Sequence, residues 1–191
     1  HMLYPDIPEL SKQQLSDLCE EFRRHNFINP EISEKLGVKR GLRNSDGTGV
    51  LAGLTNICDV VGYDKDENGR IIPKDGCLIY RGIDLNDIVE ESIQNDRFMF
   101  EEVVWLLLFG SLPDEKTLKH FTNLIENHRE LPEGFAESMI IAAPSPNIMN
   151  KMARSVLAMY SYDSDAEDPS LENILRQSMN LIAELPTMMV Y

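Results

Sequence analysis

The side chains in this sequence that most resemble a ligand site are the acids and amides between Asp64 and Asp75. Asp64, Asp66 and Asn68 stand at positions 1, 3 and 5 of a twelve-residue calcium loop of the EF-hand type, and a glycine stands at position 6. Position 12 is Asp75 rather than a bidentate Glu, and Pro73 falls inside the loop. The flanking segments also have strand patterns, whereas an EF-hand needs helices. We therefore interpret this run as a solvated hairpin loop, because Asp, Asn and Gly favour turns.

The histidines do not form a metal or catalytic group by their spacing. His120 and His128 are eight residues apart, not the three or four that place two ligands on one face of a helix. His25 follows a polar helical segment, where a cation suits the helix dipole. His1-Met2 resembles a cloning remnant, so His1 enters no chemical argument. We expect the other three histidines to be structural or solvated.

Two further patterns could hold ligands, but simpler explanations account for both. Gly47-Thr48-Gly49 suggests a nucleotide loop, but no apolar strand precedes it. The acids between Asp163 and Asp168 could bind a cation, but a charged loop before a helix start explains them fully. No G-x-S-x-G nucleophile motif occurs. The residues therefore predict no catalytic residue, no cofactor site and no metal site in this chain.

The charge and the cysteine content indicate where the protein is located and which partners it does not bind. The three cysteines, Cys19, Cys58 and Cys77, are odd in number and far apart, so we expect buried reduced thiols and a cytoplasmic location. A net charge of −14 argues against nucleic acid or an anionic membrane as a partner, since both require clustered basic residues. We find no secretory signal pattern and no membrane-spanning apolar stretch of about 18 residues.

The first part of the chain, residues 1–43, reads as an N-terminal helical arm. Ser11 is a suitable N-cap for a helix that continues to Asn26. Asn29-Pro30 begins a second, short helix, and Gly37 ends it.

Residues 44–191 form the second predicted domain, which opens with a small antiparallel β unit near residues 50–81. Its short apolar runs are Val50-Leu51, residues 57–61 and residues 78–80, and Asp64 to Pro73 is the expected connecting loop.

From Asp84 onward, the pattern predicts a series of helices. Asp84 and Asp114 are expected N-caps, and Gly110 ends the strongly apolar helix over residues 100–109. Further helices are expected over residues 133–141 and 147–160, and Asp168-Pro169 should open the last one. The residues expected to point inward from the last two are Ile148, Met149, Met152, Val156 and Leu157, and then Leu171, Ile174, Leu175, Ser178, Leu181, Ile182 and Leu185. The last pattern is still apolar at Tyr191, so we expect the chain to be truncated there.

Five ordered stretches resemble the N-terminal half of citrate synthases. They are residues 41–43 (GLR), 78–84 (LIYRGID), 100–113 (FEEV through GSLP), 129–132 (RELP) and 181–187 (LIAELPT). The resemblance covers roughly residues 40–191. Residues 44–53 make a longer and more glycine-rich connection than the family's, and residues 146–149 (PNIM) replace the family's His-Pro-Met run.

This resemblance implies a mainly α fold: part of the large helical domain of the citrate synthase fold, with the small β unit near its start. Citrate synthases are two-domain dimers that condense acetyl-CoA and oxaloacetate into citrate and CoA, so those two substrates and a homodimer are the implied partners. The family uses an Asp base, two histidines and several arginines, all beyond the segment that matches residues 185–187. No catalytic residue is therefore carried over, and the chain alone is expected to be inactive. Arg81 and Arg154 match family arginines without an assignable role.

Three interpretations remain open at this point. The chain is a piece of a citrate synthase, a piece of a 2-methylcitrate synthase, or a non-catalytic citrate-synthase-like interaction module. The first two differ by one methyl group on the acyl donor, and nothing in these residues separates them.

Overall fold

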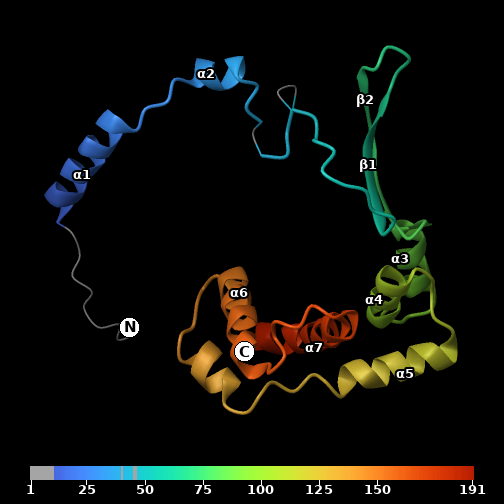
Figure 1. The fold of residues 1–191 in the computed structure, drawn as a ribbon. Helices are drawn as coiled ribbons and strands as arrows, with labels where there is room; N and C mark the ends of the chain where they lie inside the picture. Colours follow the sequence, from blue (N-terminus) through green and yellow to red (C-terminus); the bar gives the residue numbers. More distant parts are fainter. Residues whose placement is uncertain (1–10, 40, 45–46) are drawn as a thin grey trace. The chain divides into compact units, whose positions relative to one another are not determined.

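The computed structural model describes residues 11–39, 41–44 and 47–191, and this part of the chain is mainly helical (Figure 1). The chain divides into two compact units, His1–Leu54 and Thr55–Tyr191. The sequence patterns instead suggest that the helical arm ends at Arg43. Residues 1–10 of that predicted arm lie outside the described residues.

The described part of the first unit contains two helices, both predicted from their caps. α1 (Lys12–His25) begins with a capping box, in which the Ser11 hydroxyl accepts from the Gln14 N–H at 3.2 Å. α2 (Pro30–Lys35) is capped by Asn29. The predicted strand at Val50-Leu51 is wrong: these residues are not in a strand, and the Leu51 side chain is exposed. Two apolar residues between glycines are too few to bury one face of a strand.

The second unit opens with the predicted antiparallel hairpin. β1 (Cys58–Lys65) pairs with β2 (Ile71–Tyr80), and β3 (Ile83–Asp84) adds to the end of β2. The connecting loop is shorter than expected because residues 71–73 belong to β2. The Asp66 carboxylate accepts from the N–H groups of Asn68 and Arg70 at 2.9 and 2.7 Å, which closes the turn.

Five α-helices follow in the second unit, each close to its predicted position. α3 (Leu85–Gln94) and α5 (Glu115–Glu126) carry the expected caps at Asp84 and Asp114, and α4 (Phe100–Phe109) ends at Gly110. α6 (Ile148–Met159) is followed by a 3₁₀ turn, η2 (Tyr160–Tyr162). α7 spans Leu171–Val190.

Two helix predictions need correction. The N-cap of α7 is Ser170, whose hydroxyl accepts from the Asn173 N–H; Asp168-Pro169 precedes the helix and does not open it. Asp168 instead uses its carboxylate to accept from the Ser170 N–H and hydroxyl, which fixes the cap residue. The predicted helix over residues 133–141 is a shorter π-helix, η1 (Ala136–Ile141).

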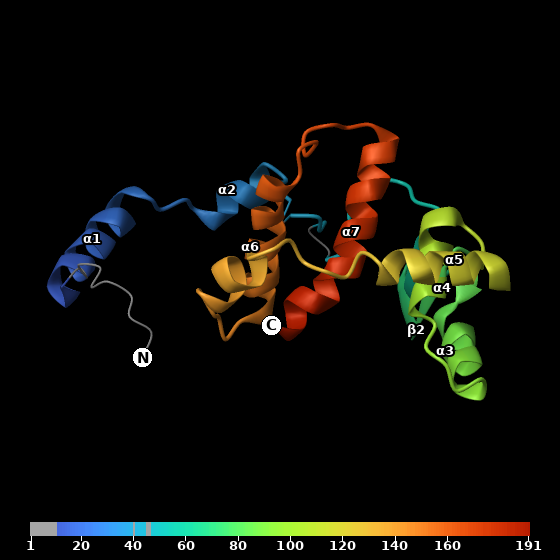
Figure 2. The same ribbon diagram turned by 90° about the horizontal axis from the view of Figure 1, so that it is seen from below.

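Three small apolar clusters form the core of the second unit, and α7 takes part in two of them. One joins α3 and α4, one joins α5 to α7, and one joins η1 to α7. Figure 2 shows α7 running beside both α5 and α6. Their buried members are Ile88, Met99 and Leu106; Phe121, Ile125 and Ala183; and Phe135, Ile140 and Met188.

The predicted inward faces of α6 and α7 are only partly correct. Met149 and Leu157 on α6 are about three-quarters exposed, and Leu171 and Ile174 on α7 are also exposed. The residue fully buried on α6 is Ser155, whose hydroxyl donates to the Lys151 carbonyl. Periodicity marks an apolar face, whereas burial also requires an element to cover it.

The prediction of buried thiols is also wrong. Cys58 is exposed at the start of β1, and Cys19 and Cys77 are half-buried. Cys58 is exposed because it lies in the solvated hairpin, where almost every side chain of β1 is exposed.

Within the described residues, no helix is both long and apolar enough to cross a membrane.

Candidate functional site

The second unit contains a pocket of about 330 Å³ beside the middle of α7. One wall is the end of α6 with η2, another is the loop that follows, and the third is α7. Its lining is a mixture of apolar and aromatic side chains with a few polar groups: Pro132, Val156, Met159, Tyr160, Tyr162, Asp163, Ala166, Arg176, Gln177, Asn180, Leu181 and Glu184.

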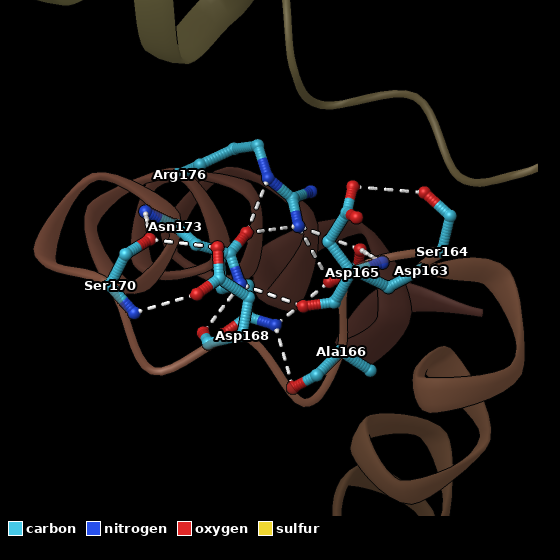
Figure 3. Close-up of polar contacts among 9 residues, drawn as sticks. Asp163, Ser164, Asp165, Ala166, Asp168, Ser170, Asn173 and Arg176 are labelled. Atoms are coloured by element: carbon cyan, nitrogen blue, oxygen red, sulfur yellow. Dashed lines mark hydrogen bonds and ion pairs between the residues drawn. The ribbon is translucent and has the colours of Figure 1, made fainter.

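Two residues of the pocket lining, Asp163 and Arg176, form an ion pair (Figure 3). The Arg176 Nη2 donates to both carboxylate oxygens of Asp163, at 2.6 and 2.9 Å. The Gln177 amide adds a bond to the same carboxylate at 2.8 Å. This amide, the Asp165 backbone N–H and the Arg176 guanidinium together lower the pKa of Asp163. The positive charge of Arg176 is therefore already compensated inside the protein.

The acids after Asp163 shape the loop that leads into α7. The Asn173 amide donates to the backbone carbonyls of Asp165 and Asp168 at 2.7 and 2.9 Å, and its oxygen accepts from Arg176 (Figure 3). Bonds from the Ser170 backbone and hydroxyl lower the pKa of Asp168. These bonds support the interpretation of this run as a charged loop before a helix start.

Tyr160 places a phenol at the edge of the pocket. Its hydroxyl donates to the Glu167 carboxylate at 2.6 Å, and this bond to a negative partner raises the pKa of Tyr160. Tyr162 packs edge-on against Phe135, with ring centroids 5.3 Å apart. The rings of Tyr160 and Tyr162 therefore make the part of the pocket that η2 lines aromatic.

Glu184 is the unusual group in the lining. Only 7% of its surface is exposed, and its Oε2 is buried without a hydrogen-bond partner. Burial raises the pKa of Glu184, and the charge of His128 opposes this only in part. No catalytic or metal-ligating motif of the sequence includes Glu184. The available signal was a lone acid inside the apolar run Leu181–Leu185.

The histidines and the hairpin acids considered in the sequence are not among the residues that line this pocket, whereas Asp163 is. Ring nitrogens of His120 on α5 and of His128 in the turn after α5 lie 3.1 and 2.7 Å from backbone carbonyls four residues earlier, and His25 pairs with Glu21. The acids between Asp64 and Asp75 belong to the hairpin. Among the described residues, no group of three or more His, Cys, Asp or Glu side chains could hold a metal ion.

The two arginines that matched family positions bind backbone carbonyls. Arg81 donates from Nε and Nη2 to the Leu107 carbonyl, at 3.1 and 2.8 Å, in the last turn of α4. Arg154 donates to the Ala143 carbonyl at 2.7 Å. Both arginines therefore join elements of the helical unit.

The chemistry open to the pocket follows from these groups. A dicarboxylate would need a free bidentate arginine, and Arg176 already binds Asp163. A weak carbon acid would need a positioned base together with donors for the enolate oxygen. The pocket offers one acid of raised pKa, one ion-paired arginine and several apolar side chains.

Residues 41–191 match the family model described as the citrate synthase C-terminal domain. The chain is 29% identical over 150 residues to 2-methylcitrate synthase 1 of Corynebacterium glutamicum, covering 78% of this chain and 33% of the relative. It is 32% identical over 118 residues to citrate synthase 1 of Mycobacterium tuberculosis (strain H37Rv), which covers 61% of this chain and 26% of the relative. The chain thus spans about a quarter to a third of the length of these relatives.

Solved structures give the same fold. The citrate synthase of Pyrobaculum aerophilum superposes with a TM-score of 0.53 at 25% identity, over 77% of this chain and 36% of that one. The citrate synthase of Thermotoga maritima has the same TM-score at 24% identity, over 81% of this chain and 34% of that one. The mainly α fold with a small antiparallel sheet is therefore confirmed.

Proposed function

Since this chain belongs to the citrate synthase family, we propose that it is part of an enzyme that condenses acetyl-CoA with oxaloacetate and water to give citrate and CoA. The observation that carries this proposal is the family match over residues 41–191. A solved relative from Thermoplasma acidophilum is a complex with carboxymethyl coenzyme A and oxaloacetate, which supports the same substrate pair.

In this proposal, the 191 residues form part of the large helical domain, and the reacting groups lie in another part of the enzyme. Two observations support this division of the enzyme between the two parts. The chain spans only about a third of the length of its relative from Corynebacterium. In addition, the arginine in its pocket is held by an aspartate and is not free for a substrate carboxylate. The 191 residues alone should therefore form no citrate.

The proposal also has to name the acyl donor, which is acetyl-CoA in a citrate synthase and propionyl-CoA in a 2-methylcitrate synthase. Citrate and 2-methylcitrate synthases both occur among the relatives, at similar identity. We take acetyl-CoA as the donor, with propionyl-CoA as the alternative that would give 2-methylcitrate. A homodimer and a cytoplasmic location complete the proposal; the exposed, unpaired thiol of Cys58 supports a reducing compartment.

The test is an assay of CoA release, with product identified by mass spectrometry. It compares the 191-residue chain with the polypeptide read in frame through the codon for Tyr191, each with acetyl-CoA or propionyl-CoA and oxaloacetate. We expect citrate from the longer polypeptide and none from the chain alone. Citrate from the chain alone would overturn the proposed division of residues. An inert longer polypeptide, or a stop codon directly after Tyr191, would overturn the enzyme assignment and favour the interaction module.

A further inference from the structure

We draw no further inference here: the strongest candidate, the exposed apolar patch of Val89 and Ile93 on α3 and Phe98 in the loop that follows it, carries nothing because the described part of the chain does not show what covers it.

Discussion

Glu184 and Arg81 show how one side chain can destabilise or stabilise the helical unit. Glu184 holds a carboxylate where water cannot reach one of its oxygens, and no donor replaces that water. Arg81 directs two N–H groups at a carbonyl in the last turn of α4, where helical carbonyls lack partners within the helix. The first arrangement lowers stability and the second raises it.

Replacement of Glu184 by Gln should stabilise the protein at neutral pH. Burial raises the native pKa of Glu184 above its ordinary value of about 4.3. The native state therefore loses stability as pH rises from that value through the raised pKa, because ionisation is easier in the unfolded chain. We expect Glu184→Gln to raise Tm by about 2 to 4 °C at pH 7.5 and to give a smaller gain as pH falls to about 4.

Calorimetry at several pH values tests this, with Glu133→Gln as the exposed control. Glu133 lies at the surface before η1, so its neutralisation should leave Tm nearly constant. A gain in Tm for Glu184→Gln that grows toward acid pH would contradict the expected loss of stability on ionisation of Glu184.

Loss of the Arg81 side chain should destabilise the junction between β2 and α4. Arg81→Ala removes both bonds to the Leu107 carbonyl and one to the Asn56 side chain. We expect the free energy of unfolding to fall by about 2 kcal/mol, the usual range for hydrogen bonds from a charged group. Urea denaturation measures it, and Arg70→Ala in the exposed hairpin turn should change it by less than about 0.5 kcal/mol. An equal change in both variants would show that the carbonyl contact does not stabilise the fold.

At the scale of elements, local chemistry at the ends decides where helices begin and stop. Asp84, Asp114, Asn147 and Ser170 each accept a bond from a backbone N–H in the first turn of their helix. Gly110 ends α4 in the left-handed conformation, at φ = 90°. These features act within a few residues, so they persist whatever packs on the helices.

Replacement of Gly110 should therefore destabilise the protein through its backbone alone. A Cβ at this position would meet no atom within 4 Å, but a side chain rarely adopts this φ. We expect Gly110→Ala to lower the free energy of unfolding by about 1 to 2 kcal/mol. Gly76→Ala is the matched control, since Gly76 also has open space but lies in β2 without a left-handed φ. A similar loss in both variants would exclude the backbone explanation.

At the scale of the whole molecule, apolar side chains remain uncovered on the helices of the second unit. Met149 and Leu157 on α6 and Leu171 and Val190 on α7 are each at least about 70% exposed. Contiguous exposed apolar surface is typical of sites that bind another polypeptide. This supports the proposed association of the chain with itself.

We expect light scattering to give a mass that rises above 21.8 kDa as protein concentration increases. Leu157→Glu should reduce this association, because it places a charge on the uncovered face of α6. Asn123→Glu adds the same charge at an exposed position on α5 and should leave the mass unchanged. A monomer at all concentrations would contradict the prediction.

The sequence by itself determined the helices, the hairpin and the family, because caps, turn residues and apolar periodicity act over a few neighbouring residues. Ser11, Asp84, Gly110 and Asp114 performed the roles that their types predict. The start of α7 was misplaced because two cap-like residues, Asp168 and Ser170, lie close together, and the hydroxyl of the second reaches the helix.

Only the tertiary structure decided which residues are buried and which polar groups meet. Leu157 and Leu171 have the spacing of core residues and remain exposed, whereas Ser155 and Glu184 are buried. The pocket brings together residues 132, 156–166 and 176–184, and no local pattern encodes that approach. Burial depends on what covers a side chain, and the covering element lies far away in the sequence.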